Sequence, residues 1–62
     1  MNPDEILKAT NDLNEYLINN GISNIRADDG KIIINEFSDE NTIIYTVNNN
    51  LQLNIEKISK YF

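Results

Sequence analysis

Residues 31–47, KIIINEFSDENTIIYTV, form the most apolar part of the chain and decide its fold. Runs of isoleucine with other β-branched neighbours are typical of strands, and the polar residues 38–41 between them are typical of a turn. We therefore predict an antiparallel hairpin with a four-residue loop. If Phe37 pairs with Thr42, Ile34 lies opposite Tyr45 and Ile32 lies opposite Val47.

The alternation of side chains along this hairpin separates a core face from an open face. The core face carries five apolar side chains: Ile32, Ile34, Ile43, Tyr45 and Val47. The open face is mixed, and its large apolar members are Ile33, Phe37 and Ile44. If a helix covers the core face, these three residues form a surface for a partner or for homodimerisation.

A third strand is predicted at residues 22–27, joined to residue 31 by a turn that contains Asp29 and Gly30. Asp-Gly is a favoured pair for a two-residue type I′ turn, since both of its positions have positive φ. That turn places Ala27 opposite Ile32 and another isoleucine, Ile25, opposite Ile34, all on the core face. Two hairpins that agree on one core face predict a three-stranded antiparallel meander.

The N-terminal segment predicts an amphipathic helix over residues 3–19. Asn2 is a good N-cap, Pro3 suits the first helical position, and the acids that follow favour a helix N-terminus. Gly21 is expected to end the helix in the left-handed conformation. A buried stripe is expected at Ile6, Thr10, Leu13 and Leu17, with Ala9 and Tyr16 on one flank and Leu7 and Ile18 on the other.

The C-terminal tail, residues 48–62, fits two patterns. A short helix that ends at Tyr61 or Phe62, with Asn50 or Asn54 as its N-cap, is favoured; a fourth strand at residues 51–55 followed by one helical turn is the alternative. The predicted fold class is therefore α+β, in the order αβββα, as a single small domain over residues 1–62. A chain of 62 residues buries only about 60% of its unfolded surface, so oligomerisation is a further possibility.

Composition limits the chemistry that this chain is expected to perform. It contains no histidine and no cysteine, which leaves no zinc site, disulfide or nucleophilic triad in cis, and its two glycines form no phosphate-binding loop. We expect no enzyme activity and no cofactor. The sequence shows neither a signal peptide nor a run of about 18 apolar residues, which favours a soluble cytoplasmic protein.

One partial motif concerns calcium. With Gly30 as the sixth position of an EF-hand loop, Asp29 is the fifth and Glu36 the twelfth, as such a loop requires. The first and third positions then fall on Ile25 and Ala27, which supply no side-chain oxygen. The hairpin turn explains the same residues, so we expect no metal site.

The acidic residues suggest a binding function. Ten acidic side chains against five basic ones give a net charge of -5 and an isoelectric point near 4.3, which disfavours direct binding to nucleic acid or to an anionic membrane and favours a basic protein partner. The two ends of the middle strand are separated by roughly 23 Å, at about 3.3 Å per residue. The candidate acidic surface comprises Asp12, Glu15, Asp28, Asp29, Asp39 and Glu40.

Such a row of carboxylates could imitate phosphates. In size, charge and build the chain is similar to the small acidic proteins of phages and mobile elements, including anti-CRISPR proteins and DNA mimics, that occupy the nucleic-acid channel of an enzyme. That similarity implies an inhibitor of a basic, nucleic-acid-handling protein. Two alternatives stay open: an assembly module that dimerises through Ile33, Phe37 and Ile44, and an acidic surface that serves only solubility.

Overall fold

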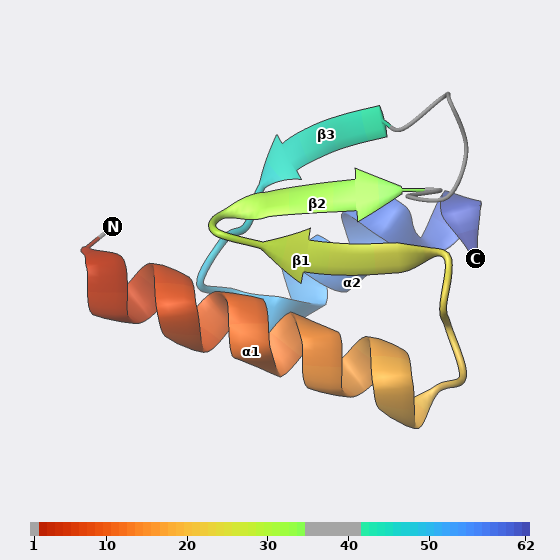
Figure 1. Cartoon of the computed structure of the whole chain (residues 1–62), viewed down its shortest axis with the longest axis horizontal. Coiled ribbons are helices and arrows are strands. Elements are labelled where there is room, and N and C mark those ends of the chain that lie inside the picture. The colour runs from red at the N-terminus through yellow and green to blue at the C-terminus, as the bar shows by residue number, and fades with distance from the viewer. Residues whose placement is uncertain (1, 35–41) are drawn as a thin grey trace.

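The structure is a computed structural model that describes residues 2–34 and 42–62, with side chains described outside residues 42–46. Its elements follow in the order α1 (Pro3–Asn19), β1 (Ile25–Asp28), β2 (Lys31–Ile34), β3 (Thr42–Thr46), α2 (Leu51–Ile58) and a final 3-10 turn, η1 (Ser59–Tyr61) (Figure 1). The prediction of an α+β fold, with an N-terminal helix, an antiparallel sheet and a short C-terminal helix, is confirmed.

Helix α1 begins as its sequence predicts. The side-chain oxygen of Asn2 accepts a hydrogen bond from the backbone N–H of Glu5 at 2.9 Å, and Pro3 occupies the first turn. This bond satisfies one of the N–H groups that a helix start leaves without a partner. Ala9, Thr10, Leu13 and Leu17 are the buried residues of the helix.

The end of α1 also explains why β1 starts later than predicted. Gly21 has φ +70°; its N–H donates to the Ile18 carbonyl at 3.1 Å, and the N–H of Ile22 donates to the Leu17 carbonyl at 2.9 Å. This is a Schellman arrangement, in which the residue after the glycine packs back on the helix. Ile22 is therefore used to close the helix, and the strand begins at Ile25 instead.

The β1–β2 hairpin has the predicted turn and register. Asp29 and Gly30 have φ values of +46° and +82°, as a type I′ turn requires, and Ala27 pairs with Ile32 while Ile25 pairs with Ile34. Burial alternates along β1, since Ile25 and Ala27 are buried whereas Arg26 and Asp28 are exposed.

The segment after β2 differs from the prediction in its register. The backbone of β3 runs antiparallel beside β2, but Ile33 pairs with Ile43 and Ile34 with Thr42, and the register shifts between Lys31 and Ile33. The predicted register assumed a four-residue loop, and any error in loop length moves every pair. That loop and Phe37 lie outside the described residues, and the complete three-stranded meander stays a prediction.

The tail forms a helix, so the alternative of a fourth strand is wrong. Asn50 is the N-cap of α2, since its side-chain oxygen accepts from the N–H of Leu53 at 3.2 Å. The residue two positions before the N-cap also contributes, because the side-chain oxygen of Asn48 accepts a hydrogen bond from the N–H of Asn50 at 2.8 Å. Residues 48–50 thus form an Asx-type turn that leads into the helix.

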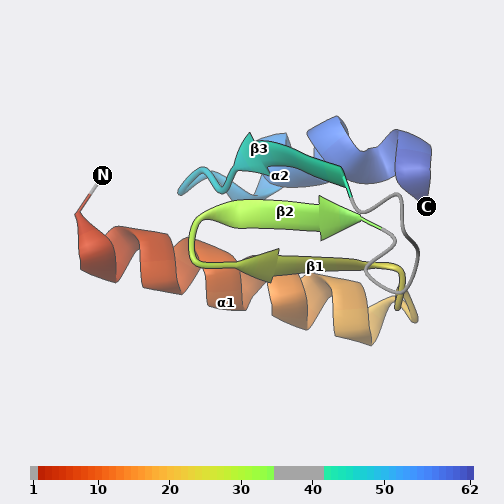
Figure 2. The ribbon, with the colours of Figure 1, turned by 45° about the horizontal axis from the view of Figure 1, so that its top comes forward.

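The core lies between the two helices and one face of the sheet. Figures 1 and 2 show α1 running along the β1 side of the sheet and α2 on the far side of the strands in the view of Figure 1. Five side chains of the described core are almost fully enclosed: Leu13, Leu17, Ile32, Ile34 and Ile58. Val47 joins them, and its N–H donates to the carbonyl of Gly30 at 2.6 Å.

Candidate partner-binding surface

The outer side of α1 carries most of the described acidic residues. Asp4, Glu5 and Glu15 are exposed, and Asp12 is partly exposed beside Lys8, with which it forms an ion pair one helical turn away. Four carboxylates against one lysine give this helix a net charge of -3. Ion pairs between exposed residues of one helix add only about 0.3–0.5 kcal/mol to stability, so folding does not require this pattern.

The β1–β2 turn brings further acids close to the start of α1. Asp28 is exposed and forms an ion pair with Arg26, with 3.1 Å between the carboxylate and guanidinium atoms. Asp29 lies at the tip of the turn and lines a hollow together with four residues from the first two turns of α1: Pro3, Ile6, Leu7 and Thr10. The turn therefore sits against the acidic end of the helix.

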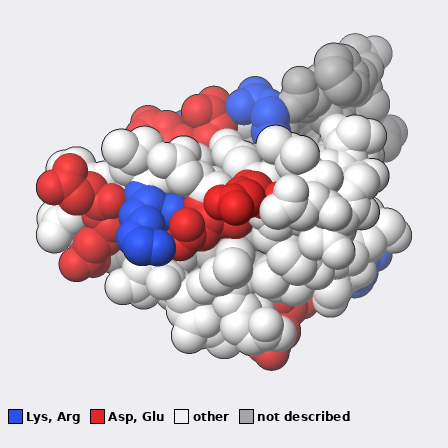
Figure 3. All heavy atoms as spheres, turned by 90° about the horizontal axis from the view of Figure 1, so that it is seen from below, with Lys and Arg blue, Asp and Glu red and all other residues white. Residues whose placement is uncertain are grey.

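These two groups of acids share one side of the molecule. Figure 3 shows acidic side chains along α1, interrupted by one basic residue, and a second acidic group at the edge above the helix. We call this set the acidic face, and it consists of Asp4, Glu5, Asp12, Glu15, Asp28 and Asp29. The structure therefore brings together four of the six acids predicted from the sequence; the other two, Asp39 and Glu40, lie outside the described residues.

A hollow of about 300 Å³ opens beside two of the predicted residues. Asp12 and Glu15 line it with Tyr16 and Asn19 of α1 and with Leu51 at the start of α2. Carboxylates above an apolar floor suit the ammonium or guanidinium end and the apolar stem of a basic side chain. Among the described residues, no three His, Cys, Asp or Glu side chains are grouped as a metal site would require.

The predicted sheet-face surface is described at only one of its three residues. Ile33 is half-buried and lies on the face opposite the core, beside Arg26 of β1. The side chains of Phe37 and Ile44 lie outside the described part. In the observed register the strand partner of Ile33 is Ile43.

Two asparagines that the sequence did not single out as binding groups hold the helices in place, one against strand β1 and one against the segment that leads into α2. The Asn14 amide donates to the Ala27 carbonyl at 2.9 Å and accepts from the Ala27 N–H at 2.8 Å. The fully buried Asn54 amide makes the same pair of contacts with the backbone of Asn48, at 2.6 and 3.0 Å. The sequence signal for such contacts is an asparagine in the middle of a helix on its buried side, because a buried amide needs hydrogen-bond partners.

Leu7 and Ile18 depart from the predicted stripe. They were expected to flank the buried side of α1, but 60% and 75% of their surfaces are exposed. The flank with Ala9 and Tyr16 is the one that packs, because it faces the C-terminal segment. The ring centroid of Tyr16 lies 6.5 Å from that of Phe62, which follows η1. An amphipathic pattern cannot tell which flank a second helix will cover.

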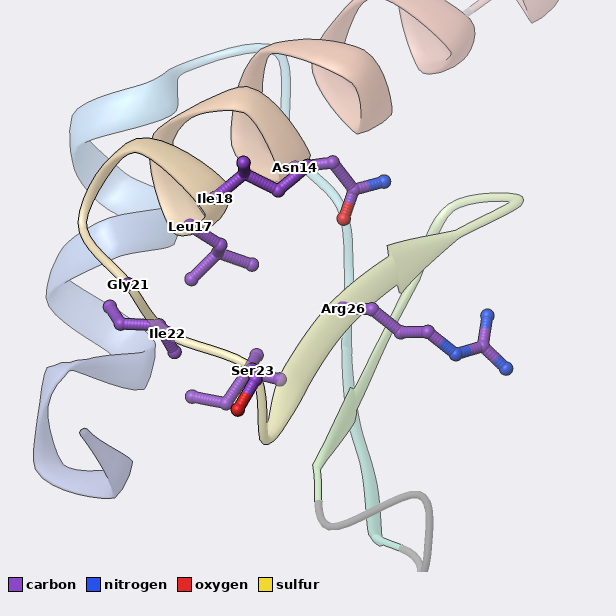
Figure 4. Close-up of a pocket in the computed structure, with 8 residues that line it drawn as sticks. Asn14, Leu17, Ile18, Gly21, Ile22, Ser23 and Arg26 are labelled. Atoms are coloured by element: carbon purple, nitrogen blue, oxygen red, sulfur yellow. The ribbon is translucent and has the colours of Figure 1, made fainter.

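A hollow of about 430 Å³ lies beside Ile18, between the end of α1 and β1. In Figure 4 the side chain of Leu17 points into the space between the two elements, whereas the guanidinium of Arg26 points away from it. The hollow is thus lined mainly by apolar groups, with Ile22 and Ile25 among them.

The described carboxylates are all exposed or half-buried, and each buried side-chain nitrogen or oxygen among the described residues has a hydrogen-bond partner. Carboxylates in these positions present their negative charge to solvent. Comparisons with protein-family models, curated proteins and solved structures gave no match. No described helix has the length and apolar character needed to cross a bilayer.

Proposed function

We propose that this chain is a non-enzymatic binding protein that engages a basic protein partner through its acidic face. The observation that supports this proposal is the position of the acids: α1 and the β1–β2 turn are far apart in sequence, yet their carboxylates lie on one side of the molecule (Figure 3). The neighbouring helix, α2, carries one acid, Glu56, and one base, Lys57, so among the described helices the excess negative charge lies on α1.

The specific form of the proposal is inhibition of a cytoplasmic, nucleic-acid-handling protein, as for the small acidic proteins of phages and mobile elements. A surface of clustered carboxylates complements the basic channel through which such a protein holds phosphates. The proposal includes the αβββα order with its three-stranded meander; Asp39 and Glu40 belong to the predicted acidic surface but lie outside the described residues.

The test compares two variants that change the net charge equally. In the first, the acids of the face are neutralised by Asp12→Asn, Glu15→Gln, Asp28→Asn and Asp29→Asn; asparagine tolerates the positive φ of residue 29. In the control, the C-terminal part of the chain receives four substitutions at exposed positions of the α2 entrance, α2 and η1: Asn49→Lys, Gln52→Lys, Glu56→Gln and Ser59→Lys. Both variants raise the net charge by four, so a difference in binding reports position rather than total charge.

Immobilised wild-type protein would be incubated with a lysate of its native host, and bound proteins would be eluted with a salt gradient and identified by mass spectrometry. We expect the wild-type protein to capture a nucleic-acid enzyme that elutes at moderate salt. The control variant should capture the same enzyme, and the neutralised variant should not. The purified enzyme should then be inhibited by wild type and by the control. Equal retention by both variants would show that the acidic face is not the binding surface.

A further inference from the structure

The side of α1 next to β1 carries an unusual line of residues. Leu7 and Ile18 are separated by three helical turns, or about 16 Å, and therefore lie on one line along the helix. Asn14 lies between them on nearly the same line. Both apolar ends are largely exposed, at 60% and 75% of their surfaces. We call Leu7, Asn14 and Ile18 the α1 strip.

Each apolar end of the α1 strip borders a hollow between α1 and the hairpin. Leu7 borders the hollow of about 260 Å³ under the β1–β2 turn, and Ile18 borders the hollow of about 430 Å³ beside β1 (Figure 4). The middle is closed, because the Asn14 amide is bound to the backbone of Ala27. The surface thus offers two apolar sites separated by a polar bridge.

Charge identifies the kind of molecule that fits this surface. Asp29 lines the first hollow. On the solvent side, helical geometry places Asp4 and Glu15 roughly 40–70° around α1 from the line through Leu7 and Ile18. A second copy of the chain would bring the same carboxylates against one another, and such juxtaposition costs affinity. A basic segment would find carboxylates on both sides of the strip at its Leu7 end. At the Ile18 end it would find Glu15 on the solvent side, and Arg26 on the β1 side is paired with Asp28.

We propose that the α1 strip docks an amphipathic basic segment of the partner protein, in which two apolar side chains about 16 Å apart enter the two hollows and lysines or arginines flank them. This inference rests on the proposed function, because it assigns the contact point of the same basic partner. The mode is that of an amphipathic helix laid along a surface groove, in which apolar anchors give affinity and flanking charges give selectivity.

The probe is a synthetic, helix-forming peptide of eighteen residues, with two leucines eleven positions apart and lysines around them. One matched peptide has serine in place of both leucines, and another has glutamate in place of the lysines. Backbone NMR spectra of the isotope-labelled protein would be recorded during titration with each peptide. We expect saturating shift changes at the α1 strip and Asp29 with the first peptide, binding at least tenfold weaker with the second, and none with the third.

The protein variants Leu7→Ser and Ile18→Ser should each weaken binding of the basic peptide about tenfold, since an apolar contact of a kilocalorie or more per side chain is lost. Leu53→Ser is the matched control, because Leu53 is an exposed apolar residue on α2, with 43% of its surface accessible. Unchanged affinity in both α1 variants, or shifts confined to α2, would overturn the inference.

Failure of this inference differs from failure of the proposed function. If the captured enzyme is lost when the acidic face is neutralised but is retained by Leu7→Ser and Ile18→Ser, the docking strip is wrong and the proposed function stands. If neutralisation of the acidic face leaves enzyme binding unchanged, the proposed function is wrong, and so is the assignment of the α1 strip as its docking site.

Discussion

Asn14 and Ala27 are joined by two hydrogen bonds of opposite direction, so the side-chain amide of a helix residue pairs with the backbone of the edge strand β1 as a neighbouring strand would. The N–H and C=O of Ala27 point away from β2, since the adjacent pair, Asp28 and Lys31, closes the two-residue turn. An open strand edge invites pairing with other chains, and the Asn14 amide covers this part of it.

Replacement of Asn14 should therefore be more costly than its partial exposure suggests. Asn14→Ala leaves the N–H and C=O of Ala27 without their partner, and we expect a loss of about 1–3 kcal/mol in the free energy of unfolding, measured by urea denaturation. Asn11→Ala is the control, since Asn11 is exposed on the same helix. Equal effects of the two substitutions would show that the amide contact contributes nothing.

The buried Asn54 should matter more than the N-cap Asn50, although both are asparagines of the same helix entrance. Asn54→Ala removes two hydrogen bonds to Asn48 and leaves a cavity, with an expected cost of about 2–4 kcal/mol. Asn50→Ala removes one exposed cap and should cost about 1 kcal/mol. Thermal unfolding followed by circular dichroism would rank the two, and the reverse order would contradict this account.

Position 21 offers a test of backbone strain without a steric clash. A Cβ atom added to Gly21 meets nothing within 4 Å, so only the positive φ of +70° opposes a side chain. Gly21→Ala should destabilise the protein by about 1 kcal/mol. A D-alanine introduced at the same position by chemical synthesis should not destabilise it, because D-residues favour positive φ. A loss of stability with both isomers would indicate a hidden contact.

Truncation of two apolar residues of α1 should change the unfolding free energy by very different amounts. Leu13 is fully buried, so Leu13→Ala should cost about 2–5 kcal/mol, which is enough to unfold much of a domain this small. Ile18→Ala should change the unfolding free energy by less than about 0.5 kcal/mol, since its side chain is mostly exposed. A large destabilisation by Ile18→Ala would mean that the Ile18 side chain packs within the fold and is therefore unavailable for docking.

Local chemistry explains which parts of the structure the sequence predicted. The bounds of α1 and the β1–β2 register depend on signals carried by adjacent residues: the cap at Asn2, the glycine at position 21 and the Asp29-Gly30 turn. These signals do not need the rest of the fold. The acidic residues of the helix were visible in the same way, because charged side chains on an amphipathic helix lie away from its apolar stripe.

The parts that were missed depend on contacts between distant segments. The exposure of Leu7 and Ile18 follows from which flank α2 covers, and the contacts of Asn14 and Asn54 follow from where β1 and Asn48 lie. The start of β1 was misplaced because Ile22 serves the helix end first. Periodicity alone contains none of this information, since it does not specify neighbours in space.

The hydrogen bond from Val47 to the Gly30 carbonyl links the two halves of the chain. Because that carbonyl belongs to the hairpin turn and Val47 leads into α2, detachment of either the hairpin or the C-terminal helix breaks this bond and opens the core that both of them cover. The molecule should therefore behave as one cooperative unit, in which amide protons of β1, β2 and α2 exchange with solvent through the same global opening. If the chain acts as proposed, a partner would therefore meet either the complete acidic face or an unfolded chain.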